Sequence, residues 1–411
     1  MKRSLLLYVG VGLAYAAGSQ VAFTWFGADG TGASFFPSAG VTLAALVLTR
    51  RRQWPIVLAA AGTAELVLDQ LHGIELVPTL GYVAANLTEP LVGALLLTAL
   101  VKARVDLSRT RDLSLFVVCA VIAGPAAGAV LGATTKVVLS DGEGWLPFAG
   151  QWLVGDGLGV LVVAGSVLAL RTDPPQAFGP LRVAEGLFLA GLALAATVVV
   201  FWLDWLPLVY VPIALLVVIA FRVGTAGVAL TGAGVAFLAA EATSEGHTFW
   251  DTLEITPATG VVYLQLALLV LVASSLTLAA EIAQRERAAA AWASADAARK
   301  ESFTMAVHAE RLRSLAEAVG HATTTKEVAA VLEEYGFGGV VGLPPLDSYG
   351  EGTERYLRES AGRIARDAYA RVQLLETERA ARTRAELLER HAKGLAAATT
   401  VGEVAAATVS L

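Results

Sequence analysis

Residues 257–300 read PATGVVYLQLALLVLVASSLTLAAEIAQRERAAAAWASADAARK. The first part, Pro257–Ala280, contains no charged side chain, and about 20 apolar residues in a helix cross the ~30 Å hydrocarbon core of a bilayer. From Glu281 to Gly320 the chain is rich in Ala, Glu, Arg and Gln and has no Pro. This stretch predicts a membrane-spanning helix that continues as a charged helix outside the bilayer.

The whole chain is too apolar for a soluble globular protein. Of its 411 residues, 56% are hydrophobic and the mean hydropathy is +0.63, whereas soluble domains average about 45–50% apolar residues. Apolar runs between polar breaks give ten candidate spans: Ser4–Phe26, Phe35–Leu48, Trp54–Leu68, Leu80–Val101, Leu113–Val138, Phe148–Leu170, Gly186–Leu203, Leu206–Phe221, Gly227–Ala240 and Pro257–Ala280. Because four of these runs are short, the expected fold is an all-α polytopic membrane bundle of 8–10 transmembrane helices.

Basic residues test the order of these spans, because cytoplasmic loops carry an excess of Lys and Arg. With the N-terminus inside and the spans alternating, Lys136 is the basic residue toward the outer face, and twelve others fall inside: Lys2, Arg3, Arg50, Arg51, Arg52, Lys102, Arg104, Arg109, Arg111, Arg171, Arg182 and Arg222. The pattern predicts an even number of spans with both termini cytoplasmic. A cleaved signal peptide ending near Ala16–Ser19 is the less favoured alternative, because further spans follow.

Composition also excludes several classes of partner and site. A net charge of -6 argues against nucleic acid, whose phosphate backbone requires a basic surface. A single cysteine, Cys119, leaves no disulfide within one chain and makes a cysteine metal site improbable. The glycine-rich Gly338–Gly342 lacks the Lys and Ser/Thr of a phosphate loop. His308 lacks the neighbours of a phosphoacceptor. We therefore expect no cofactor, no metal and no catalytic output in these residues.

Ionisable side chains inside the predicted spans are the first candidates for function, because each costs at least about 2.5–3.5 kcal/mol at mid-span. Helical spacing places Asn86 and Glu89 on one face, and Trp152 and Asp156 on another. Counted from the outer span ends, all the ionisable groups fall in the outer half. We predict a polar pocket open to the outside, with Lys136 as the counter-charge; the alternative is a structural network that fixes helix register. The pocket candidates are Glu65, Asn86, Glu89, Lys136, Trp152 and Asp156.

A stripe of small residues marks the fifth candidate span. Gly124, Gly128 and Gly132 recur at every fourth position, which lets another helix approach closely. Packing within the bundle is the favoured interpretation, and a dimerisation seam is the alternative.

The last third of the chain carries more than half of its charge. Residues 281–411 hold 17 of the 30 Lys and Arg and 19 of the 36 Asp and Glu. Residues 281–320 are predicted to form one helix, and weak apolar spacing suggests a parallel contact with a second copy. Thr324 and Glu327 have the spacing of a capping box, which predicts a short helix to about Tyr335. The Ala-Thr-Thr and Glu-Val-Ala-Ala pattern near 322–330 returns near 398–406, which suggests two copies of one module opening.

Three motifs in the membrane region resemble a known family. They are Phe35-Phe-Pro-Ser-Ala-Gly followed by Arg50-Arg-Arg-Gln-Trp-Pro55, Asn86-Leu-Thr-Glu-Pro90, and Trp152-Leu-Val-Gly-Asp-Gly-Leu-Gly159. Their order and spacing are similar to those of the MASE-type (membrane-associated sensor) domain, the first of that series. The edges of the tail, 312–332 and 354–376, resemble the opening and closing helices of a GAF module, with a reduced middle.

The resemblance implies a bacterial inner-membrane input module of the kind that precedes kinases, cyclases or phosphatases. The expected domains are a membrane sensor (1–280), a signalling or coiled-coil helix (281–320), a reduced GAF-like segment (321–380) and a helix opening a second module (381–411). Expected partners are the lipid bilayer, a second copy through 281–320, an unknown small ligand and a cytoplasmic signalling protein. Because no output domain follows, the native protein is expected to be longer or a truncated sensor. The alternatives are a permease for a small solute and a scaffold without a ligand.

Overall fold

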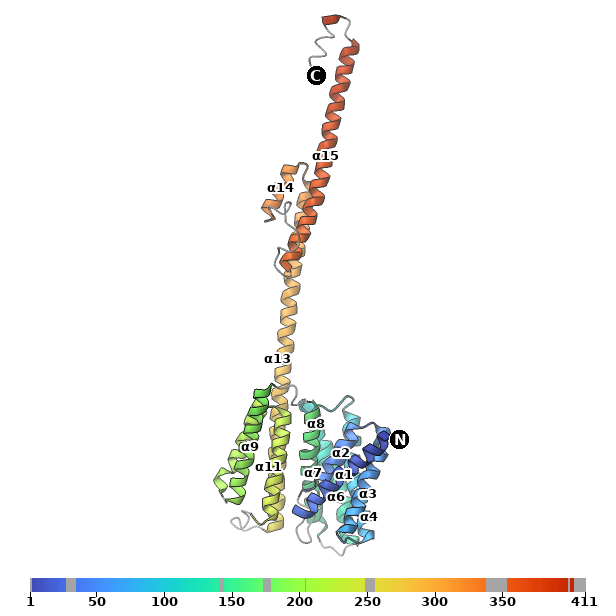
Figure 1. Cartoon of the computed structure of the whole chain (residues 1–411), viewed down its shortest axis with the longest axis vertical. Helices are drawn as coiled ribbons and strands as arrows, with labels where there is room; N and C mark the ends of the chain where they lie inside the picture. Colours follow the sequence, from blue (N-terminus) through green and yellow to red (C-terminus); the bar gives the residue numbers. More distant parts are fainter. Residues whose placement is uncertain are drawn as a thin grey trace. The chain divides into compact units, whose positions relative to one another are not determined.

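The computed structural model describes residues 2–26, 35–139, 144–172, 179–203, 205–247, 256–337, 353–397 and 400–402. Within these ranges the chain is almost entirely helical and contains no strand (Figure 1). It divides into two compact units, Met1–Ala289 and Ala290–Leu411. The all-α expectation is therefore confirmed for the described residues.

The first half of unit 1 contains the helices that carry the three motifs. They are α1 (Lys2–Trp25), α2 (Pro37–Leu48), α3 (Trp54–Leu71), α4 (Leu76–Leu100), α5 (Thr110–Phe116), the π-helical segment η2 (Val117–Ala123), α6 (Gly124–Leu139), α7 (Trp145–Gly159), the π-helical segment η3 (Val160–Ala164) and α8 (Gly165–Thr172). The segments α5–η2–α6 and α7–η3–α8 each form one continuous apolar rod.

The second half of unit 1 contains α9 (Pro180–Trp202), the 3₁₀ turn η5 (Leu206–Val209), α10 (Tyr210–Arg222), α11 (Thr225–Ser244) and the first part of α13 (Pro257–His321). In Figure 1, α9 and α11 lie on one side of the unit and α1–α4 lie on the other, with α7 and α8 between them. Two buried apolar clusters each draw residues from both halves, and η3 together with α8 links the halves through contacts with α2 and α11.

Each of the ten apolar runs coincides with one of these helical rods. Seven of the described helices are long and apolar enough to span a bilayer, whereas α2 and α10 are shorter apolar helices. The remaining rod is α3, whose last turns carry Glu65 and Asp69. The runs that looked short in the sequence are therefore short or more polar helices rather than loops.

Local chemistry explains where these helices begin. Pro37 and Pro180 open α2 and α9, and Pro55 lies in the first turn of α3; a first-turn proline has no helical hydrogen bond to lose. Gly224, with φ of 97°, precedes α11 in a conformation that side chains with a Cβ rarely adopt.

Unit 2 has a small core of its own. The end of α13 packs with α14 (Thr325–Glu334) and α15 (Thr353–Ala397) around Leu315, Val319, Val328, Leu332 and Ala365. The guanidinium of Arg371 donates hydrogen bonds of 2.7 Å to the carbonyl oxygens of Val319 and Gly320, which lie in the last turn of α13. The bond to Gly320 satisfies a carbonyl at the end of the helix, and the Val319 carbonyl also accepts from the Ala322 backbone N–H at 3.3 Å.

Several tail predictions can be checked. The continuous helix after Ala280 and the capping box are confirmed: α13 extends to His321, and the Glu327 backbone N–H donates to Thr324 Oγ1 at 3.2 Å. The helix α15 continues without a break through Gly394 to Ala397. A single glycine costs a helix only ~1 kcal/mol, which the rest of α15 tolerates.

The domain boundaries in the tail stay predictions. The described structure divides at 289/290, and the expected boundary at 380/381 lies inside α15. The strand-like middle of the GAF-like segment, 338–352, lies outside the described residues, as does most of the second copy of the repeat.

The capping box makes α14 sensitive to acid. The pKa of Glu327 is lowered because its carboxylate accepts a hydrogen bond from the Thr323 backbone N–H, supported by Thr324. A pKa below the ordinary 4.5 means that the carboxylate stabilises the helix above that pH and loses this effect as the pH falls toward the folded value. We expect amide-exchange protection of α14 to fall below about pH 4.5 in the wild type. Glu327→Gln should remove this pH dependence, and Glu334→Gln should keep it.

Candidate functional site

Buried acidic side chains from three helices gather in the first half of unit 1. Glu65 and Asp69 lie one turn apart on α3, Glu89 lies midway along α4, and Asp156 lies on α7. Each is at most 5% exposed. Ionised groups are expensive in such surroundings, so the partners of each carboxyl group determine what the cluster does.

Glu65 is held by hydrogen bonds from two neighbouring helices. Ser19 Oγ on α1 donates to one carboxylate oxygen at 3.3 Å, and Asn86 Nδ2 on α4 donates a short hydrogen bond to the other. The Tyr15 hydroxyl, one turn before Ser19, lies close enough to interact electrostatically with this carboxyl group. Both oxygens of Glu65 are thus occupied by the protein itself.

Glu89 and Asp156 form the second half of the cluster. Trp152 Nε1 donates to Glu89 Oε2 at 3.4 Å, and Asp156, one turn further along α7, lies against the same carboxyl group. Trp152 and Asp156, which were predicted to share one face of their helix, therefore both contact the Glu89 carboxyl group. Asn86, which shares a face with Glu89, bonds to Glu65 instead.

Some polar atoms of the cluster are left without a partner. Among the described residues, Glu89 Oε1, Asp156 Oδ2, Asp69 Oδ2 and the Tyr15 hydroxyl are buried and have no hydrogen bond of acceptable geometry. Unpaired buried polar atoms cost about 1–3 kcal/mol each and are rare in folded proteins. The orphaned oxygens of Glu89 and Asp156 are therefore the acceptors of the cluster that a further hydrogen-bond donor would satisfy.

Aromatic rings and glycines surround this pair. The Trp152 ring stacks on Tyr82 at 6.2 Å between centroids and lies 5.9 Å from Phe148. A Cβ on Gly128 would lie 2.9 Å from Glu89 Oε2, and one on Gly132 would overlap the Trp152 ring. Two glycines of α6 thus provide the space that Glu89 and Trp152 occupy.

The glycine stripe faces the interior of unit 1. Gly124 lies against the backbone of Glu89 and Gly93 on α4, while Gly128 and Gly132 face α4 and α7. This placement agrees with packing within the bundle, the favoured interpretation of the stripe.

Replacing Gly132 by alanine tests this packing. We expect Gly132→Ala to displace the Trp152 ring, shift the tryptophan fluorescence and lower the free energy of unfolding by about 1–3 kcal/mol. Gly150→Ala on α7 is the matched control, because nothing lies within 4 Å of its Cβ position. Equal unfolding curves for the two variants in mixed micelles would contradict the close approach of α6 to Trp152.

Lys136 is engaged elsewhere. Its ammonium lies over the Phe148 ring, 5.3 Å from the centroid, and the ion pairs found among the described residues do not join it to Glu65, Glu89 or Asp156. Its role as counter-charge stays a prediction. No group of three or more His, Cys, Asp or Glu among the described residues is arranged to hold a metal ion.

Sequence reasoning missed three members of the cluster. Tyr15 and Ser19 lie in a span that was treated as uniformly apolar, and Asp69 was assigned to an outer loop. A signal was present: Tyr15–Ser19 and Glu65–Asp69 are both pairs at i, i+4 spacing, which places each pair on one face of its helix.

Comparison with known proteins identifies the membrane region. The model of the MASE1 family matches residues 3–286, which covers nearly all of unit 1 and all three motifs. No curated protein and no solved structure gives a significant match. With more than half of its length matched and seven helices of membrane-spanning length and composition, this chain is a multi-pass membrane protein that belongs to the MASE1 family of membrane-associated sensory domains.

Proposed function

We propose that this protein is a sensory input protein of the bacterial inner membrane that binds a small cationic molecule at Glu89 and Asp156 and relays binding through α13. The observation that carries the proposal is the pair of orphaned carboxyl oxygens, buried at the meeting point of α4, α6 and α7. In this proposal the site binds a ligand and does not catalyse a reaction.

The surroundings of the pair favour a protonated amine. Two acceptor oxygens without donors match an ammonium group, and the aromatic Trp152 side chain lies beside them, with its indole N–H on Glu89. Glu65, by contrast, is already saturated by Ser19 and Asn86. The ligand pocket therefore comprises Glu89, Asp156 and Trp152, and Glu65 with Asn86 supports it.

Contacts at one end of unit 1 support the proposal that both termini lie on the cytoplasmic side of the membrane. Arg182 Nε donates to the carbonyl of Arg222 at 2.9 Å, which joins two of the basic loops. Asp106, in another of these loops, pairs with Arg287 on α13 at 3.5 Å. Basic loops that meet at the end from which α13 continues are the arrangement that the positive-inside rule favours for a cytoplasmic face.

The same loop offers a route from the pocket to α13. Residues 101–109 connect α4, which carries Glu89, to α5. Arg287 bonds to Ser108 as well as to Asp106, and Thr110 donates to Glu281 at 3.3 Å. A ligand that prefers one packing of α4 over another would shift these contacts and thereby α13, which continues to His321 as one helix.

A second copy is the proposed partner of α13 beyond the membrane. Trp292 and Phe303 are 72% and 71% exposed, and at 100° per residue both fall on one face of the helix with Arg299. Pairing with a second copy would bury these rings. We expect Trp292→Cys to form an intermolecular disulfide in native membranes at least fivefold faster than Glu301→Cys, which faces the opposite way. Equal rates would contradict a dimer through this face.

The amine site is tested with purified protein in nanodiscs. We expect at least one of methylammonium, ethanolamine or putrescine to raise the melting temperature of the wild type. The shift should vanish in Glu89→Gln and Asp156→Asn and persist in Glu75→Gln, whose side chain is exposed before α4. No shift with any amine, or an equal shift in all the variants, would overturn the proposed ligand class.

Two π-helical segments, η2 and η3, keep a transporter as the second candidate. Such segments are frequent at functional sites, and α4 also contains Pro90 within its length. Interrupted helices near buried charges are common in secondary transporters. Accumulation of a labelled amine in proteoliposomes, lost in Glu89→Gln, would assign the site to transport; binding without flux would assign it to sensing.

A further inference from the structure

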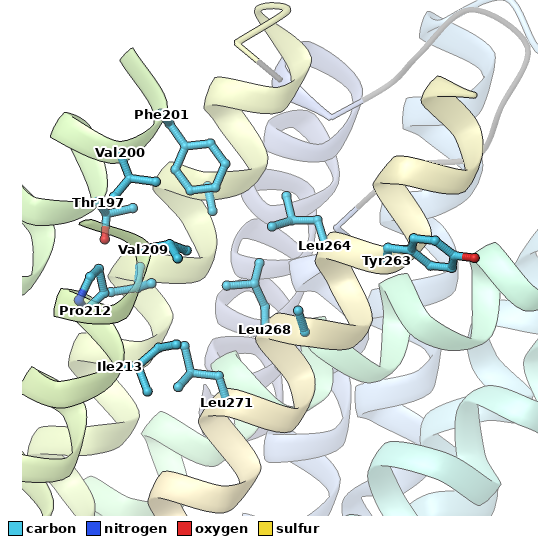
Figure 2. Close-up of a pocket in the computed structure, with 13 residues that line it drawn as sticks. Thr197, Val200, Phe201, Val209, Pro212, Ile213, Tyr263, Leu264, Leu268 and Leu271 are labelled. Carbon is cyan, nitrogen blue, oxygen red and sulfur yellow. The ribbon is translucent and has the colours of Figure 1, made fainter. Parts of the chain in front are cut away.

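A second hollow lies in the other half of unit 1, away from the acidic cluster. It has a volume of about 310 Å³ and lies between α9, α10, α11 and α13 (Figure 2). Figure 2 shows Leu264, Leu268 and Leu271 of α13 directed toward α9 and α10, whereas the Tyr263 ring extends away from them. The volume is about twice that of the ~150 Å³ apolar cavities that take up benzene.

The lining of this cavity offers almost nothing to a polar ligand. Among the described residues, no charged side chain lines it, and its hydroxyl groups belong to Thr197 and Tyr263. Thr197 Oγ1 already donates to the Ala193 carbonyl at 2.9 Å within α9. Water needs two to four polar partners to occupy a cavity, so a hydrocarbon is the favourable occupant.

The cavity opens sideways, toward the lipid. Ile213 and Tyr263 on its rim are 39% and 58% exposed on apolar helices of the bundle. It lies at the end of α9 near Trp202, which bonds to Glu245 at 3.1 Å, and thus away from Arg182 and Arg222. An occupant would therefore enter laterally from the leaflet opposite the basic loops.

We propose that this cavity binds one acyl chain of a membrane phospholipid, as a site separate from the acidic pocket. Its wall on α13 is a single helix face, since Leu264, Leu268 and Leu271 recur at spacings of four and three. An acyl chain between this face and α9 replaces contacts that α13 would otherwise make with that helix. Lipid occupancy and α13 packing are thereby coupled, whatever the acidic pocket binds.

Photolabelling of the full-length protein in nanodiscs tests the site. The probe is phosphatidylethanolamine with a diazirine on one acyl chain, and labelled peptides are located by mass spectrometry. We expect labelling of the peptides around 197–201 and 264–271 to saturate as the probe fraction rises, because a site fills. Labelling of lipid-exposed surfaces such as that of α1 should rise in proportion to the probe fraction.

A pair of variants on α13 supplies the control. Ala267→Phe fills the cavity from its rim and should reduce cavity labelling at least fivefold, whereas Leu266→Phe adds the same ring on the exposed face and should leave it unchanged. Unsaturable labelling in the wild type would overturn the proposal even where Ala267→Phe fails to fold. Saturable labelling by diazirine palmitic acid but not by the phospholipid would overturn the phospholipid as the occupant.

Discussion

Gly159→Ala is expected to lower the free energy of unfolding by about 3 kcal/mol, the largest effect of any single methyl group in this bundle. A Cβ at position 159 would overlap the carbonyl group of Phe36 at the start of α2. That group is backbone, and the following Pro37 has a fixed φ, so the clash cannot be relieved by a side-chain rotation. Overpacking of a close contact costs about 1–3 kcal/mol and more where backbone must move.

Unfolding by sodium dodecyl sulfate in mixed micelles, followed by tryptophan fluorescence, measures this loss. Gly165→Ala is the control, because the nearest atom to its Cβ position is Phe116 Cε1 at 3.8 Å, an ordinary contact. Gly165→Ala should raise the free energy of unfolding by less than about 1 kcal/mol, because alanine has a higher helix propensity than glycine. If both variants unfold alike, α2 and α7 do not approach as closely as the structure places them.

The sequence predicted the helices of unit 1 well because each one depends on a local property. A run of apolar residues must be helical in a bilayer, since backbone groups have no other partners there. The start of α2 at Pro37 and the length of α13 beyond Ala280 follow from the same local signals. The resemblance to a sensor family likewise rested on short motifs that the family match over residues 3–286 bears out.

Pairing between helices could not be predicted in this way. Spacing placed Asn86 and Glu89 on one face, but only the packing of α3 against α4 shows that Asn86 bonds to Glu65. The same limit applies to Lys136, because a charge at a plausible depth says nothing about the direction of its side chain. Phe148, its partner, precedes Trp152 by one turn on α7.

The apolar cavity has no sequence signal at all. Leu264 and Leu268 lie in a run where the neighbouring Leu266 is 48% exposed, and the residue type is identical. In a membrane helix, apolar side chains face both lipid and core, so hydropathy does not distinguish a lipid-facing leucine from one that lines a hollow. Acidic residues differ from leucines, because an ionisable side chain in a membrane span has a high free-energy cost. The sequence therefore marks these residues as unusual whichever way their side chains point.

Asn86→Leu is expected to be the second most damaging change, and it separates the two halves of the acidic cluster. Leucine keeps the number and branching of the heavy atoms of Asn86 but removes the hydrogen bond to Glu65, which is 4% exposed. Leaving Glu65 Oε1 without a donor, while Ser19 still donates to Oε2, should cost about 2–4 kcal/mol. In a Glu65→Gln background the same substitution should cost less than half as much, because an amide is cheaper to leave unpaired than a charge.

Glu89→Gln should behave differently, because Glu89 Oε1 has no hydrogen bond to lose and Trp152 can still donate to the amide oxygen. Its unfolding free energy should remain within about 1 kcal/mol of the wild type, while its response to amines disappears. That combination assigns Glu65 and Asn86 to the scaffold and Glu89 and Asp156 to recognition. If Glu89→Gln destabilises the protein as much as Asn86→Leu does, the whole cluster is a structural network that fixes helix register, and the ligand must bind elsewhere.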